Sequence, residues 1–142
     1  SHGELILQVL STLVTSTPQL GPVIIRRLLN AWPKKDASRE VTWLRLIHCM
    51  LTTIPPSLLT SIPRIHTPLV NTLARCLGSE HAGVAKGTAT LLNDLTILLH
   101  HILPFPFAKR KIQETLARNR QHWNPLVQET SEELYDRVLD LI

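Results

Sequence analysis

The chain has 142 residues, of which 44% are apolar, and a formal net charge of +4, a composition that allows one domain with a buried core. The small positive excess and the 4% of aromatic residues argue against a nucleic-acid surface built on base stacking. No apolar run is long enough to cross a bilayer and no secretory signal is visible, which predicts an intracellular protein, cytoplasmic or nuclear, without membrane contacts.

Proline and glycine divide the chain into segments whose apolar residues recur at the three-and-four spacing of a helix. The helices that this spacing predicts span residues 5–14, 22–32, 39–53, 68–77, 81–103 and 107–120, with a last helix from residue 125. Ser38 is expected to cap the third helix and Thr67 the fourth, with Pro68 at its first position. Gly78 is expected to end the fourth helix in the left-handed conformation.

The predicted fifth helix is the longest and carries two glycines, Gly83 and Gly87. Each weakens a helix by about 1 kcal/mol relative to alanine. In a helix with an otherwise continuous apolar stripe, they indicate close approach to a neighbouring helix. No segment alternates with the period of two that a strand requires, so the predicted fold class is all-α.

A weak internal repeat accompanies the helices. Leu28-Leu29-Asn30, Leu73-Ala74-Arg75 and Leu116-Ala117-Arg118 each end a predicted helix, at spacings of 45 and 43 residues. HEAT and armadillo repeats have lengths of about 40–47 residues. We therefore expect an α-solenoid of antiparallel helix pairs, about three repeats plus a terminal helix, forming a single domain over residues 1–142. Ser1-His2-Gly3 resembles a cloning remnant, and the abrupt end of the last helix suggests a fragment of a longer protein.

Residue patterns that carry chemistry are missing from the sequence. No two histidines stand at i and i+4 in a predicted helix, and there is no phosphate-binding glycine loop, nucleophile elbow or zinc-protease motif. We expect no metal, no cofactor and no enzymatic activity. The densest basic cluster comprises Lys109, Arg110, Lys111, Arg118 and Arg120. A solvated helix face explains this cluster best, and an acidic or phosphorylated protein is its natural target if it binds a partner.

Several runs of residues carry a resemblance to a known family. They are Leu28-Leu29-Asn30-Ala31-Trp32-Pro33-Lys34 with Ser38-Arg39-Glu40-Val41, then Pro56-Ser57, Pro68-Leu69, Leu73-Ala74 and Cys76, then Ser79-Glu80-His81 with Val84-Ala85 and Asn93, and finally His122-Trp123-Asn124. Together, in this order and spacing, they resemble the C-terminal repeats of the B-prime family of regulatory subunits of protein phosphatase 2A. Their basic surroundings depart from the acidic concave face of that family, which indicates a divergent member.

The resemblance implies a pseudo-HEAT solenoid that binds the phosphatase scaffold and catalytic subunits and recruits substrates, including phosphorylated proteins. The family's groove for short linear motifs lies in more N-terminal repeats. The residues expected to contact partners are Lys34, Lys35, Arg118 and Arg120. The corner residues shared with the family are Trp32, Pro33, Glu40, His81, Asn93, His122, Trp123 and Asn124. Among these, both tryptophans are expected to be packing wedges and both histidines to cap or brace corners.

Two other functions fit the same pattern. A helical-repeat scaffold with an unrelated partner would share the fold and differ only in what it binds. A nucleic-acid-binding repeat would use the basic cluster, and its affinity would fall steeply with salt.

Overall fold

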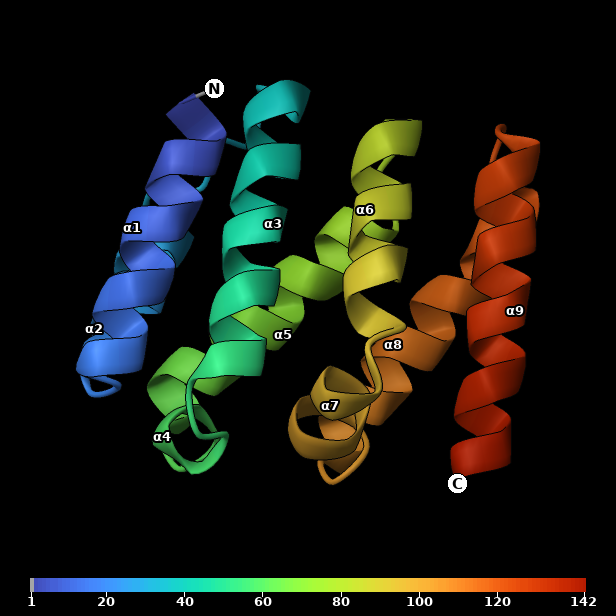
Figure 1. Ribbon diagram of the computed structural model, residues 1–142. Coiled ribbons are helices and arrows are strands. Elements are labelled where there is room, and N and C mark those ends of the chain that lie inside the picture. Colours follow the sequence, from blue (N-terminus) through green and yellow to red (C-terminus); the bar gives the residue numbers. More distant parts are fainter. Residues whose placement is uncertain (1) are drawn as a thin grey trace. The chain divides into compact units, whose positions relative to one another are not determined.

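The computed structural model describes residues 2–142, and this part of the chain is all-helical, without strands (Figure 1). It divides into two compact units, Ser1–Leu69 and Val70–Ile142, called unit 1 and unit 2 below. Ser1, the first residue of the expected cloning remnant, lies outside the described residues, whereas His2 and Gly3 fall within the first helix. In the described part of the chain no helix is long and apolar enough to cross a membrane.

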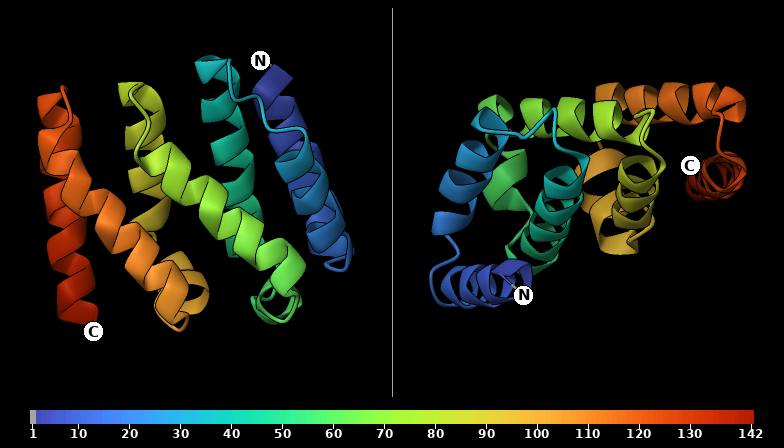
Figure 2. Two further views of the ribbon diagram at one scale, coloured as in Figure 1. Left: turned by 180° about the vertical axis from the view of Figure 1, so that it is seen from behind. Right: turned by 90° about the horizontal axis from the view of Figure 1, so that it is seen from above.

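Unit 1 is built around helix α3. Its elements are α1 (His2–Ser16), α2 (Leu20–Asn30), α3 (Ala37–Thr53), α4 (Ser57–Thr60) and the first half of α5 (Pro63–Leu77). Helix α1 lies beside α3, as Figures 1 and 2 both show, and α2 contacts α1, α3 and α4. The interior of the unit is apolar, with fully buried side chains that include Ile25, Ile47, Met50, Leu51 and Leu59.

Two helix starts in unit 1 differ from the sequence-based prediction. Asp36, not Ser38, caps α3, because its carboxylate accepts a hydrogen bond from Arg39 N at 3.2 Å. Helix α5 begins at Pro63, so Pro68 lies inside the helix instead of at its first position and Thr67 is not a cap. A proline at the true first position explains the early start, since its missing N–H would have no partner there.

Gly21 approaches a neighbouring element closely, whereas Gly83, which the sequence singled out, approaches no other helix. A Cβ built on Gly21 would lie 2.8 Å from Ile54 Cγ2, so the start of α2 packs directly on the end of α3. A Cβ on Gly83 would meet only the ring of His81, two residues earlier in the chain, at 3.1 Å. Gly78 is not in the left-handed conformation, since no described glycine has a positive φ.

Unit 2 contains the rest of α5, α6 (Ala82–Leu92), α7 (Leu95–Ile97), the π-helix η1 (Leu98–Ile102), α8 (Pro106–Arg118), the 3₁₀-helix η2 (Asn119–Gln121) and α9 (Pro125–Leu141). Helix α9 packs against both α6 and α8. The buried apolar side chains at its centre are Leu77, Leu91, Leu98, Ile112, Leu116, Leu134 and Val138. The predicted start of the last helix at Pro125 is confirmed.

The long helix predicted over residues 81–103 is wrong, because it breaks at Asn93–Asp94. Asn93 ends α6, and the carboxylate of Asp94 accepts from Thr96 N at 3.0 Å to start α7. The break turns Leu95 and Leu99 out of the apolar stripe, and they are 43% and 42% exposed. A carboxylate that caps a new helix start offsets part of the loss of continuous helical hydrogen bonds.

Candidate protein-interaction surface

The turn between α2 and α3 is held by a buried tryptophan. The Trp32 indole N–H donates to Glu40 Oε2 at 2.8 Å, and both side chains are buried. The ring meets Trp43 edge to face, with ring centroids 5.7 Å apart. Burial of the carboxylate is compatible with this fold because the indole supplies it with a donor. Trp32 is therefore a packing residue, as the sequence predicted, and Glu40 is its partner.

Lys34 and Lys35 lie in that turn, and both are exposed. The turn is fixed by backbone hydrogen bonds from Lys34 N to Trp32 O at 2.9 Å and from Asp36 N to Pro33 O at 3.1 Å. Within residues 2–142, neither lysine forms an ion pair. Unit 1 thus presents two adjacent positive charges on a well-defined turn.

In unit 2, residues 77–80 and 119–123 form one corner, called the unit 2 corner below. The buried Asn119 amide donates to Leu77 O at 2.9 Å and to Ser131 Oγ at 3.0 Å. His122 Nε2 lies 2.8 Å from Ser79 O. Side chains from the later segment therefore supply hydrogen-bond partners to backbone carbonyls at the end of α5, where helical donors are no longer available.

The imidazole of His122 braces this corner on both sides. Asn124 N donates to its Nδ1 at 3.0 Å, which assigns the ring proton to Nε2 and makes Nε2 the donor to Ser79 O. Asn124 in turn caps α9, because its Oδ1 accepts from Leu126 N at 2.9 Å. The predicted bracing role of His122 is confirmed.

Trp123 does not have the packing role that the sequence predicted. Its side chain is 64% exposed, its ring stacks on His122 with centroids 5.7 Å apart, and its indole N–H donates to Glu80 O at 2.7 Å. The N–H is satisfied at the surface, so the ring lies over the corner and outside the core. His81, by contrast, caps α6 as expected, with Nδ1 accepting from Val84 N at 3.4 Å.

The two predicted contact residues of unit 2, Arg118 and Arg120, are both exposed. Arg118 donates to Thr115 Oγ1 at 3.2 Å and lines an open groove at the unit 2 corner with Gly78, Glu80 and His122 among its other walls. The guanidinium carbon of Arg120 lies 5.4 Å from the centre of the Tyr135 ring, within cation–π range. Both charges are held near the corner by neighbouring side chains.

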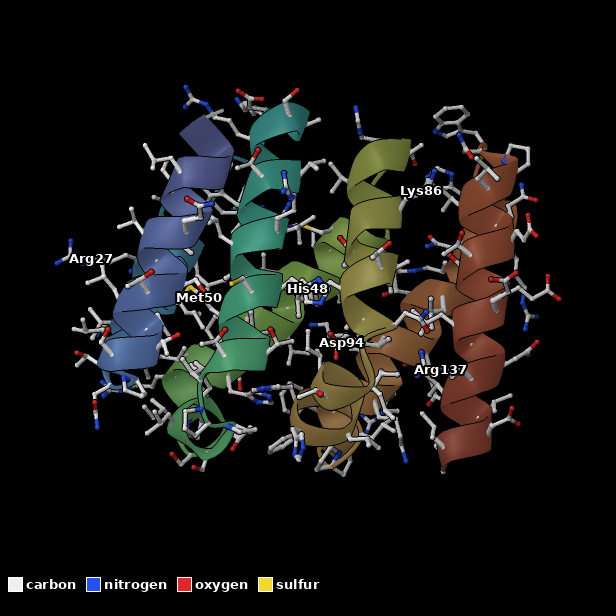
Figure 3. All side chains as sticks on the ribbon, in the orientation of Figure 1. Arg27, His48, Met50, Lys86, Asp94 and Arg137 are labelled. Atoms are coloured by element: carbon white, nitrogen blue, oxygen red, sulfur yellow. The ribbon has the colours of Figure 1, made fainter. Side chains whose placement is uncertain are left out.

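Asn93 has a partner that sequence reasoning missed. The guanidinium of Arg137, on α9, donates to both the main-chain oxygen and Oδ1 of Asn93 at the end of α6. Figure 3 labels Arg137 on α9 and Asp94 at the neighbouring end of α6. The contact joins residues 44 positions apart, and only the weak repeat of similar length signals it in the sequence.

The sequence-predicted residues therefore gather at three places. Trp32, Pro33, Lys34, Lys35 and Glu40 belong to the α2–α3 turn of unit 1. The unit 2 corner and its immediate neighbours hold His81, Arg118, Arg120, His122, Trp123 and Asn124. Asn93 lies at the end of α6 beside Arg137. In the part of the chain that the structure describes, no group of three or more His, Cys, Asp or Glu could hold a metal ion.

Comparison with known proteins identifies the family. The family model described as "Protein phosphatase 2A regulatory B subunit (B56 family)" matches residues 2–141. The chain is 33% identical over 132 residues to the "Serine/threonine-protein phosphatase 2A 56 kDa regulatory subunit alpha isoform" of Homo sapiens, covering 89% of this chain and 25% of that protein.

A plant relative agrees with this match. The theta isoform of the 57 kDa B' regulatory subunit of serine/threonine protein phosphatase 2A from Arabidopsis thaliana is 35% identical over 116 residues, covering 77% of this chain and 22% of that protein. The chain thus spans about a quarter of the length of these relatives. With a family model matched from residue 2 to residue 141, the chain belongs to the B56 family of protein phosphatase 2A regulatory B subunits.

Proposed function

We propose that this chain acts as part of a non-catalytic regulatory subunit that docks on the scaffold–catalytic core of protein phosphatase 2A and helps direct it to substrates. The observation that carries the proposal is the family match over residues 2–141, together with relatives that are named regulatory subunits of this phosphatase. The substrates include phosphorylated proteins, and the protein works inside the cell, in the cytoplasm or the nucleus.

The proposal includes the repeat architecture, an α-solenoid of HEAT-like helix pairs that forms one domain over the whole chain. Contacts inside unit 2 support it. Four side chains, those of Asn119, His122, Trp123 and Arg137, form hydrogen bonds with backbone oxygens of residues that lie earlier in the chain. The separations are 42, 43, 43 and 44 residues. Those separations match the repeat spacings of 43 and 45 residues read from the sequence. Stacked repeats of constant length place equivalent positions side by side.

The docking contacts that we propose are the exposed cations on the turns, Lys34 and Lys35 in unit 1 and Arg118 and Arg120 in unit 2. Turns and loops that a rigid helical framework holds in place often carry binding residues. Their positive charge would favour acidic surfaces of the phosphatase core or of its substrates.

The experiment is a direct binding measurement. Purified scaffold–catalytic heterodimer is titrated into this chain by calorimetry, and co-migration of the two is followed on a sizing column. The human alpha isoform serves as the positive control. A stable complex with the heterodimer supports the proposal. A folded chain that does not bind, beside a control that binds, would refute docking by this segment.

Charge reversal tests the proposed contacts. The double variant Lys34→Glu with Lys35→Glu should weaken binding to the heterodimer by roughly 5- to 20-fold, since exposed ion pairs contribute about 0.2–1 kcal/mol each and reversal adds repulsion. Lys86→Glu, an exposed lysine on α6, is the matched control and should leave binding unchanged (Figure 3). Equal loss in both variants would point to a nonspecific charge effect.

A further inference from the structure

A groove in unit 1 has no role in the contacts described so far. It runs between α2 and the α4–α5 segment, which Figure 2 shows as neighbouring helices when the molecule is seen from behind. Two hollows make it up, and they share Arg26, Ile62, Arg64 and Ile65, so the groove is continuous. Along α2 it extends from Gln19 to Asn30, about 16 Å at 1.5 Å per residue.

One wall is a face of α2, and the other is formed by α4, the turn that follows it and the start of α5. The wall on α2 consists of Gln19, Pro22, Val23, Arg26, Leu29 and Asn30, and the opposite wall consists of Leu58, Ser61, Ile62, Arg64, Ile65 and Pro68. On the α2 wall most residues recur three or four positions apart, which is the spacing of one helix face. The floor is apolar and in part open, and Val23 is 52% exposed.

The charge of the groove has one sign. Arg26 and Arg64 are exposed and line it, and Arg27 lines an adjoining hollow on α2. Among the residues that line these hollows there is no aspartate or glutamate. Among the side chains that the structure describes, the guanidinium groups of Arg26 and Arg64 have no hydrogen-bond or ion-pair partner. The groove therefore offers an apolar floor flanked by positive charges with which no described side chain of unit 1 forms an ion pair.

The lining also decides the conformation of the occupant. An extended segment laid on this floor would bury backbone N–H groups, and the side-chain acceptors that the walls offer them are those of Gln19, Asn30 and Ser61, because Arg26 and Arg64 can only donate. A helix pairs its own backbone groups internally, so it can cover an apolar floor without that cost. Its side-chain ridges can also pack along the helix face that α2 presents to the groove.

We propose that this groove binds an acidic amphipathic helix of a partner protein. Apolar residues of that helix at i, i+3 or i+4, and i+7 would cover Val23, Ile62 and Ile65, and its flanking carboxylates would pair with Arg26 and Arg64. The inference rests on the geometry and charge of unit 1 and does not depend on docking to the phosphatase core.

The test uses the whole chain and a synthetic probe. The probe is a fluorescein-labelled peptide of roughly 15 residues, about four helical turns, held helical by a lactam bridge, with leucines on one face and glutamates on its flanks. Fluorescence polarisation measures its binding. The expected result is saturable binding that weakens with salt, with much weaker binding for a peptide whose glutamates are lysines and for one with a central proline.

Matched variants locate the site. Arg26→Glu and Arg64→Glu should each weaken binding of the glutamate probe by about 5- to 10-fold, since each replaces an attraction by a repulsion. Arg110→Glu, an exposed arginine on α8 outside the groove, should have no effect. Val23→Asp should abolish binding, whereas Val9→Asp, at a valine of α1 that is 50% exposed and outside the groove, should not. Circular dichroism melts confirm that every variant is folded.

Three results would overturn the inference. The first is no binding of the glutamate probe at millimolar concentration, and the second is binding that Arg26→Glu and Arg64→Glu leave unchanged. The third is self-association of the chain, seen by sedimentation, that the same two variants abolish, because the occupant would then be a second copy of the chain.

Discussion

Replacing Asn119 by alanine tests the view that side chains of the later segment hold the unit 2 corner together. Asn119 is only 4% exposed, and its amide makes two hydrogen bonds, to Leu77 O at 2.9 Å and to Ser131 Oγ at 3.0 Å. Each bond contributes about 1 kcal/mol net, and a buried carbonyl left unpaired costs about 1–3 kcal/mol. We therefore expect Asn119→Ala to destabilise the chain by about 2–4 kcal/mol.

The assay is thermal and urea unfolding followed by circular dichroism. For a chain of this size, 1 kcal/mol corresponds to roughly 4 °C in Tm, so the expected loss is roughly 8–15 °C. Asn119→Asp keeps the shape but turns an oxygen toward Leu77 O, so it should destabilise at least as much at neutral pH. Asn71→Ala is the matched control, since Asn71 is exposed and its side-chain oxygen accepts from the Lys111 amine at the surface. A melting temperature for Asn119→Ala within about 2 °C of the wild type would refute the reasoning.

Four further substitutions separate the remaining structural roles, each checked by thermal melting. Trp32→Ala should cost about 3–5 kcal/mol because the ring is buried, whereas Trp123→Ala, at a ring 64% exposed, should cost about 1 kcal/mol for one hydrogen bond; the reverse order would contradict these roles. Gly21→Ala should cost about 1–3 kcal/mol because its Cβ would lie 2.8 Å from Ile54 Cγ2, and an unchanged melt would disprove the close approach. Asp94→Ala should cost about 1 kcal/mol by removing the cap of α7, and a gain in stability would show that the helix prefers to be continuous.

Local signals in the sequence were sufficient to predict some elements correctly. The last helix begins at Pro125 because the side chain of Asn124 accepts a hydrogen bond from Leu126 N and because proline has no N–H that would need a partner. Both features belong to two adjacent residues of the sequence. The caps at His81 and the corner at Trp32 follow from similarly short patterns. Such signals depend on neighbours within a few residues, which is why the sequence reveals them.

Other features depend on contacts between distant residues, and the sequence could not reveal them. The apolar spacing continues through Asn93 and Asp94, so a single helix was predicted there, but Arg137 bonds to both oxygens of Asn93 from 44 residues away. The close approach at Gly21 involves Ile54, which lies 33 residues later in the chain. The surface position of Trp123 follows from its bond to Glu80 O, 43 residues earlier. Each outcome was set by tertiary packing that overrides local preference.

The spacing of the bonds at the unit 2 corner also sets an order of events during protein synthesis. The carbonyls of Leu77, Ser79 and Glu80 receive their side-chain partners only from residues 42 or 43 positions later. At about 5–20 residues per second, a ribosome needs roughly 2–9 seconds to add that stretch. The bond from Trp32 to Glu40, by contrast, spans eight residues and can form almost as soon as it emerges. During translation, the α2–α3 turn of unit 1 can therefore form early. The carbonyls at the end of α5 gain their side-chain partners only after Asn119, His122 and Trp123 have been synthesised.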